Sequence, residues 1–310
     1  IRFDQDNFTI DNNLLKNFSP RMAISWSISE DNRWKINFTT GRYFKIPTYT
    51  ILGFKNLNNN FINKDSEYTR SDHLVFGIEY NNTDSSRFSL EAFNKKYYNY
   101  PVSVNDMVSL ANKGGDFEVL GNEDVSTSGR GKSYGIEFLY QQKLKNNFYG
   151  ILSYTFFYSK FSGFDEVFLP SVWDNRNLIS FTGGYKLKKN WEISSKLRFT
   201  DKTPYAPINN KLSSQSYPEI VFDYSQLGNY YLDSFLKLDV RIDKRWNFKT
   251  TSMNFYIDIE NLLLNEIPIP PEYGLERDNN QNVILPWNLI EVESGNRNSI
   301  IPSIGFVFDF

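Results

Sequence analysis

The sequence predicts an all-β protein, an antiparallel transmembrane β-barrel. Three observations predict it: side chains alternate between apolar and polar, short connections alternate with long ones, and the last segment is an amphipathic strand that ends on Phe310. No run of about 18 apolar residues occurs, so the sequence offers no membrane-spanning helix, whereas a barrel strand needs only about 9–11 residues of alternating polarity.

Period-two alternation is clearest near the end of the chain. In FLKLDVRIDK at 235–244, every second residue from Leu236 to Ile242 is apolar, and the residues between them are charged. Successive side chains of a strand point to opposite faces, so such a segment has one apolar and one polar face. We predict strands at 21–29, 34–43, 73–80, 87–97, 132–142, 148–159, 178–187, 191–200, 234–244, 252–260 and 300–310. With Ile1–Gln5 as the end of a further strand, these make about twelve strands.

The connections between these segments alternate in length. Short polar turns are expected at 30–33, 81–86, 143–147 and 188–190, and long connections at 44–72, 98–131, 160–177, 201–233 and 261–299. Short turns at one end and long loops at the other are typical of outer-membrane barrels, where the loops are extracellular. A soluble β-sandwich would alternate in polarity too, but would not show this asymmetry.

Charged side chains occupy the middle of the polar face. Facing lipid, each would cost about 2–4 kcal/mol at the midplane, so we expect this face to line a wet lumen or to contact a domain that fills it. The candidates for lumen or plug contacts are Glu79, Glu91, Glu137, Lys196, Arg198, Lys237, Asp239, Arg241, Asp258 and Glu260. Asp239 and Asp258 could suggest acid–base chemistry, but Lys237 and Arg241 on the same face are expected to neutralise them.

The composition excludes several classes of function. The chain has no cysteine and a single histidine, His73, so disulfides, thiol catalysis and multi-histidine metal sites are excluded. The net charge of -2 gives no basic field for nucleic acid. We expect no cofactor, no metal site and no enzymatic activity, because no nucleophile motif accompanies His73.

The ending SIGFVFDF places Ser303, Gly305, Phe308 and Phe310 in the spacing of the last strand of outer-membrane barrel proteins. Such a strand pairs with the assembly machinery and then closes the barrel, which leaves no exposed edge. We expect these residues to act in folding.

Many segments together resemble the C-terminal barrel region of TonB-dependent outer-membrane receptors. They include SPRMAISWSI at 19–28, HLVFGIEYN at 73–81, SLEAFNKKYYNYPVS at 89–103, GRGKSYGIEFLYQQKL at 129–144, WDNRNLISFTGGYKLKKNWEISSKLRF at 173–199, LKLDVRIDKRW at 236–246 and IPSIGFVFDF at 301–310. Members of this family carry an N-terminal plug domain with a TonB box, followed by a barrel of about 22 strands. Residues 1–310 contain neither plug nor TonB box, so the resemblance implies a single barrel region corresponding to the final half of such a barrel.

The resemblance implies a receptor in the bacterial outer membrane that imports a scarce solute, such as a metal chelate, with inner-membrane energy. Its expected partners are outer-membrane lipid, a plug domain in cis, a TonB-type energy transducer, the barrel-assembly machinery and other surface or complex subunits, but no nucleic acid. The alternative function is a non-transporting barrel subunit of a larger outer-membrane assembly.

The long connections carry the candidates for ligand capture, because mixtures of aromatic and polar side chains suit an organic ligand. These candidates are Tyr98, Tyr100, Asp106, Tyr205, Tyr217, Tyr224, Tyr230 and Tyr231. The acidic residues Asp116, Glu118, Glu123 and Asp124 could bind calcium, although they lack EF-hand spacing and a solvated acidic loop is the competing interpretation.

Overall fold

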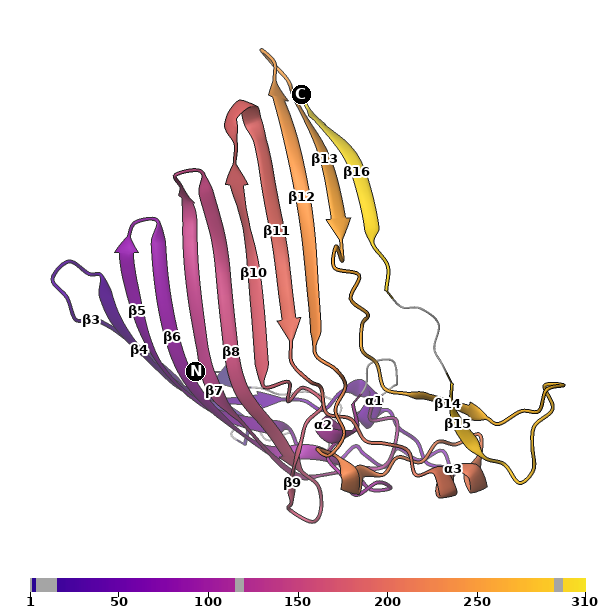
Figure 1. The fold of residues 1–310 in the computed structure, drawn as a ribbon. Coiled ribbons are helices and arrows are strands. Elements are labelled where there is room, and N and C mark those ends of the chain that lie inside the picture. Colours follow the sequence, from indigo (N-terminus) through magenta and orange to yellow (C-terminus); the bar gives the residue numbers. More distant parts are fainter. Residues whose placement is uncertain (1, 4–15, 115–119, 293–297) are drawn as a thin grey trace.

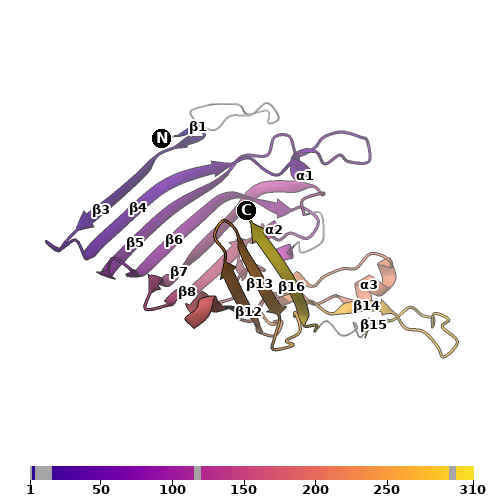
Figure 2. The same cartoon turned by 90° about the horizontal axis from the view of Figure 1, so that it is seen from above.

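The computed structural model describes residues 2–3, 16–114, 120–292 and 298–310. One large antiparallel sheet dominates it and curls into an open arc (Figures 1 and 2). The path through this sheet runs from β16 at one edge to β3 at the other, and within the described residues these two edges do not pair with each other. The predicted all-β antiparallel class is confirmed, and the sheet has the form of a partial barrel.

Eleven strands make up the path. They are β3 (Arg21–Ser27), β4 (Trp34–Lys45), β5 (Thr69–Thr83), β6 (Ser86–Ser103), β7 (Val125–Lys145), β8 (Phe148–Ser162), β10 (Asn177–Lys186), β11 (Trp191–Thr200), β12 (Phe235–Asn247), β13 (Ser252–Glu260) and β16 (Ile301–Asp309). A short strand, β9 (Phe168–Pro170), adds to the end of β8. Each strand pairs with the next along the chain, and all eleven predicted segments form strands of this path.

Short turns gather at one end of the sheet and long loops at the other (Figure 1). Asn146 and Asn147 form one turn with positive φ, and Lys189 and Asn190 form another within the 3-10 turn η1 (Lys188–Asn190). Asparagine tolerates this left-handed conformation, which a tight hairpin needs. The predicted asymmetry of the connections is therefore confirmed.

Several strands are longer than the sequence predicted, most of all on the loop side, although β5, β7 and β12 also extend by three residues on the turn side. β5 begins at Thr69 instead of residue 73, β6 continues to Ser103, and β7 begins at Val125 instead of residue 132. At the chain start, β1 (Arg2–Phe3) pairs with β2 (Phe18–Ser19) in a separate sheet, so part of the predicted strand Ile1–Gln5 is confirmed and the rest lies outside the described residues.

The register places apolar residues on one face of the sheet across many strands. Phe38 pairs with Phe76, Phe76 with Ala92, Ala92 with Ile136 and Ile136 with Phe156. Large apolar side chains on this face are strongly exposed, for example 53% for Ile24 and 61% for Phe306. An apolar surface of this extent must be covered, and the opposite face is polar, so lipid covers it in a membrane barrel.

Loop segments form a layer over one end of the sheet (Figure 1). This loop layer contains α1 (Tyr49–Leu52), α2 (Leu110–Lys113), α3 (Asn210–Ser216), the 3-10 turn η2 (Tyr224–Gln226) and the hairpin of β14 (Glu272–Leu275) with β15 (Leu289–Val292). Its small apolar core consists of Ile51, Leu110 and Val125, with Leu120 packed against it. No helix in the described parts of the chain is long and apolar enough to cross a membrane.

The buried side chain of Asn63 fixes this core to the sheet. Its amide nitrogen donates to the carbonyl oxygens of Ile51 and Glu123 at 3.1 and 2.8 Å, and its side-chain oxygen accepts from the Val125 amide at 3.2 Å. Because all three bonds are shielded from water, they hold α1 and the start of β7 together.

Candidate functional site

The ten charged residues that the sequence assigned to a lumen all lie on the polar face of the sheet. Strand register shows this directly, since Arg198 pairs with Lys237, Lys196 with Asp239 and Arg241 with Asp258. Seven of the ten, on β11–β13, line a hollow of about 410 Å³. The polar face is therefore the concave, inner face, and the apolar face is the outer one.

Lys237 is the centre of an ion-pair cluster on the inner face. Its ammonium donates to the Glu260 carboxylate at 2.8 Å and lies 3.5 Å from the Asp239 carboxylate. Asp239 in turn accepts from the backbone amide of Asn261 at 3.0 Å. The predicted neutralisation of Asp239 by Lys237 is confirmed.

Arg241 differs from the expectation. Its guanidinium binds both carboxylate oxygens of Asp243 at 2.9 Å and stacks over the Tyr256 ring at 3.8 Å. Arg241 forms no direct ion pair with Asp258 within the described residues. The two residues still face each other across β12 and β13 and their charges attract, so the expected neutralisation of Asp258 takes place without a direct contact. Residues two apart on one strand share a face, and the bidentate geometry with Asp243 is the stronger arrangement.

Besides Asp258, four of the ten predicted inner-face charges form no ion pair within the described residues. Glu91 and Glu137 face each other across β6 and β7, while Lys196 and Arg198 lie in the hollow of β11–β13. Directly opposed like charges destabilise a sheet unless a counter-charge is present. The concave face thus presents an acidic position at Glu91 and Glu137. It also presents two cations without an ion pair, in a hollow that acidic side chains line as well, and each position can bind a group of opposite charge in the lumen.

Glu79 behaves differently from these four. Arg87 lies 3.5 Å from its carboxylate, Lys35 lies at 4.0 Å, and the Asn81 side chain donates to it at 2.9 Å. Its charge is satisfied within the sheet, so Glu79 is less available to a lumen partner than Glu91.

Two predicted loop residues lie in β6 instead of a loop. Tyr98 pairs with Arg70, whose guanidinium stacks on its ring at 3.9 Å, and both belong to the outer face. Asn99, with φ of 54°, then makes a bulge that turns Tyr100 inward against Phe161, with ring centroids 4.5 Å apart. Both tyrosines were expected in the connection 98–131. They instead continue β6, and the bulge turns them to opposite faces of the sheet.

Asp106 is held by the loop layer itself. The Lys113 ammonium lies 2.6 Å from both the Asp106 and the Glu123 carboxylates, and the Ser103 hydroxyl also donates to Glu123. Burial lowers the pKa of Lys113, but the hydrogen bonds to Asp106 and Glu123 outweigh it and raise this pKa above the ordinary value.

The calcium hypothesis gains no support from this arrangement. Asp116 and Glu118 lie outside the described residues, and Glu123 is occupied by Lys113. Within the described ranges, no group of three acidic or histidine residues is placed to hold a metal ion.

Replacing Lys113 with methionine is expected to lower the free energy of local unfolding around α2 by roughly 2–3 kcal/mol, because two shielded carboxylates lose their cation. Since the pKa of Lys113 is raised, its contribution should persist up to pH 10.5, the ordinary lysine value, and disappear as the pH rises through the higher folded value. Hydrogen exchange of α2 measures both effects. Lys45→Met, at an exposed residue of β4, is the matched control and should leave exchange of α2 unchanged.

Tyr205 and Tyr230 lie together, with ring centroids 6.1 Å apart, and Tyr231 forms an isolated β-bridge with Pro204. Burial, together with Tyr273, Glu291 and Tyr230, raises the pKa of Tyr205. The sequence missed Tyr273 and Glu291 because they belong to the β14–β15 hairpin inside a predicted connection. Tyr205, Tyr231 and Glu291 line a hollow of about 510 Å³.

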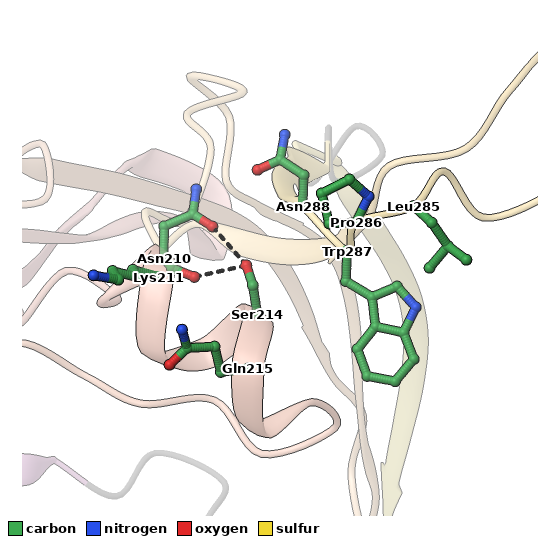
Figure 3. Close-up of a pocket in the computed structure, with 8 residues that line it drawn as sticks. All are labelled: Asn210, Lys211, Ser214, Gln215, Leu285, Pro286, Trp287 and Asn288. Atoms are coloured by element: carbon green, nitrogen blue, oxygen red, sulfur yellow. Dashed lines mark hydrogen bonds between the residues drawn. The ribbon is translucent and has the colours of Figure 1, made fainter.

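Tyr217 and Tyr224 belong to other parts of the loop layer. Tyr217 packs edge-on against Trp287 with centroids 5.8 Å apart, and Tyr224 packs against Phe222 at 6.0 Å. Trp287 lines a hollow of about 610 Å³ between α3 and residues 285–288, shown in Figure 3. On its α3 side, the Ser214 hydroxyl donates to the Asn210 carbonyl oxygen at 2.7 Å. The predicted tyrosines therefore do not gather around one hollow.

The last strand carries the predicted assembly residues on both faces. Phe308 pairs with Met253 on the outer face and is 57% exposed, and Phe310 is fully exposed. Ser303 and Gly305 face inward, opposite Asp258 and Tyr256. A Cβ atom at Gly305 would lie 2.3 Å from the Tyr256 ring, so a larger residue here would require this ring to move.

Comparison with known proteins agrees with this architecture. A family model described as TonB dependent receptor-like, beta-barrel matches residues 1–262. No curated protein matches the chain.

Three similar solved structures come from outer membranes or import systems. The ferric-catecholate import receptor Fiu of Escherichia coli K12 has 9% identity and a TM-score of 0.56 over 93% of this chain and 34% of its own. The outer membrane transporter YddB of Escherichia coli has 14% identity and a TM-score of 0.59 over 99% and 42%. The ferripyoverdine receptor of Pseudomonas aeruginosa has 13% identity and a TM-score of 0.55 over 94% and 32%. At these identities the likeness shows a shared fold, and the chain spans between 32% and 42% of the length of these proteins.

Proposed function

The chain belongs to the TonB-dependent receptor-like β-barrel family, and from this premise we propose that it forms part of an outer-membrane receptor that imports a scarce solute. The energy would come from the inner membrane through a TonB-type transducer. Membership in a family of transport receptors also agrees with the prediction that the chain is not an enzyme.

The observation that carries this proposal is the inner face with its unpaired charges. A barrel wall with no further role could pair its inner charges among themselves, as Lys237 and Glu260 do. Glu91 with Glu137, and Lys196 with Arg198, instead present like charges toward the lumen. We propose that a plug domain in cis meets both positions with opposite charge, so that moving the plug breaks and reforms ion pairs.

A metal chelate is the solute class we favour. Two of the similar structures are named as receptors for ferric catecholate and for ferripyoverdine. In this chain, the hollow lined by Tyr205, Tyr231 and Glu291 offers the mixture of aromatic and polar groups that an organic chelate requires.

The test uses cells that lack the receptor gene and are complemented with variants of it. We expect the double variant Lys196→Glu/Arg198→Glu to take up radiolabelled iron chelate roughly tenfold more slowly than wild type. This corresponds to a loss of about 1.4 kcal/mol in the interaction between plug and barrel. Lys188→Glu/Lys189→Glu makes the same charge change at a short turn and should transport normally.

The alternative, a non-transporting barrel subunit, makes the opposite prediction. Uptake of every chelate would then be independent of the receptor gene, while its deletion would disturb assembly of a larger envelope complex. That combination of results would contradict the transport proposal.

A further inference from the structure

Three lysines form a row on the outer face of the sheet at its loop end. Lys96 of β6 pairs with Lys132 of β7, and Lys132 pairs with Lys160 of β8. Directly paired residues of adjacent strands have Cβ atoms about 5 Å apart. This lysine row therefore places three positive charges side by side on neighbouring strands.

The lysine row lies at the border of the apolar band. On β7 the outer-face residues that follow Lys132 are Tyr134, Ile136 and Phe138, and on β8 Tyr158 precedes Lys160. The rings of Tyr134 and Tyr158 stack with centroids 5.2 Å apart. Tyrosines favour the membrane interface, so the row is placed at the level of the lipid headgroups on the loop side.

The acidic residue beside the lysine row on β5 is already paired with other cations. Asp72 lies one strand beyond Lys96, but Arg42 binds it at 2.7 and 3.1 Å and Arg70 lies 3.5 Å away. Asp72 therefore has two cations of its own and adds no net negative charge to the surface.

Two acids on the loop side also have cations of their own. Glu166 pairs with Arg130 at 3.9 Å, and Asp174 is buried, accepts from the Ser159 amide at 2.8 Å and lies 3.2 Å from Arg176. The charge of Lys160 contributes to lowering the pKa of Asp174, but burial outweighs this and leaves that pKa raised.

Within the described residues, none of the three lysines has an ion pair. The Lys132 ammonium lies over the Phe168 ring at 4.3 Å, and this uncharged ring does not neutralise it. Three like charges on a low-dielectric border repel one another, and an anion with several charges removes that repulsion.

We propose that the lysine row binds the phosphate groups of a lipid headgroup in the outer leaflet. A lipid fits better than a soluble anion, because the row lies on the outer face, directly beside the apolar side chains that its acyl chains would contact. Lys96 and Lys160 flank Lys132, so a headgroup with two phosphates can bridge all three. Arg70, stacked on Tyr98, borders the row at the adjacent strand.

The experiment uses the intact receptor purified from outer membranes and measures retained lipid by native mass spectrometry. The probes are bisphosphorylated lipid A, the same lipid after removal of both phosphates, and inorganic phosphate. The test variant is Lys96→Gln/Lys132→Gln/Lys160→Gln. The control Lys143→Gln/Lys188→Gln/Lys249→Gln removes the same charge at the short turns.

We expect wild type and control to prefer bisphosphorylated lipid A over the dephosphorylated lipid, and the test variant to bind it about a hundredfold more weakly, at about fivefold per lysine. Equal binding of both lipids by wild type would overturn the proposal. So would equal loss in both triple variants, or inorganic phosphate that competes at the same concentration as the lipid. A test variant that fails to assemble is replaced by the single variant Lys132→Gln, for which about a fivefold loss is expected.

Discussion

Replacing Ile136 with arginine is expected to destabilise the barrel by about 2–4 kcal/mol, the cost of a cation at the lipid midplane. Ile136 is 45% exposed on the outer face, between Ala92 and Phe156 of the adjacent strands. No acidic side chain occupies this row of paired residues. Urea unfolding in lipid vesicles, followed by tryptophan fluorescence, measures the change.

The adjacent residue supplies the control for this prediction. Glu137 points to the inner face opposite Glu91, so Glu137→Arg introduces the same cation beside an unpaired carboxylate. We expect no loss of stability, or a small gain, for this variant. Equal destabilisation by both substitutions would contradict the assignment of faces.

Gly135→Ala is expected to cost about 3 kcal/mol or more, because β7 has no room for a side chain there. A Cβ atom at this position would lie 2.2 Å from the carbonyl oxygen of Phe156 and 2.7 Å from the Cβ atom of Phe157. The first of these is a backbone atom of the paired strand, so relief requires the ladder between β7 and β8 to move. The fraction that resists unfolding in detergent on a gel should fall sharply.

Gly77→Ala is the matched control for this substitution. Gly77 lies on the same inner face, but the atoms nearest its added Cβ all belong to the Glu91 side chain, with Cγ at 3.1 Å, and that side chain can rotate away. We expect a change within about 1 kcal/mol. A Gly135→Ala protein as stable as Gly77→Ala would show that the close contact at β7 is absent.

The strands could be predicted from the sequence because lipid and lumen impose opposite demands on alternate residues. This holds in the membrane band, where Leu236 to Ile242 are apolar at every second position. Beyond the band, β6 packs against the loop layer and Val102 and Ser103 are both fully buried. With both faces covered, the alternation disappears, so the strand ends near residues 103 and 125 were missed.

The sequence predicted the inner-face charges of the candidate site better than the aromatic residues near the loops. The period-two pattern was enough to place all ten charges on the inner face. It could not show that Arg241 forms its ion pair with Asp243 and not with Asp258. At the loop end of β6, the bulge at Asn99 turned Tyr98 and Tyr100 to opposite faces, which period two alone does not predict. Contacts such as Tyr217 with Trp287 join residues far apart in the chain, and no local pattern carries them.

The most direct test of the membrane barrel is the accessibility of β12 in lipid. The chain has no cysteine, so single cysteines can be introduced from Leu236 to Asp243 and spin-labelled without background. We expect labels at Leu236, Leu238, Val240 and Ile242 to be relaxed by oxygen, which concentrates in lipid. Labels at Lys237, Asp239, Arg241 and Asp243 should be relaxed by a water-soluble nickel chelate. Loss of this alternation, or its reversal, would contradict the assignment of an outer lipid face and an inner charged face.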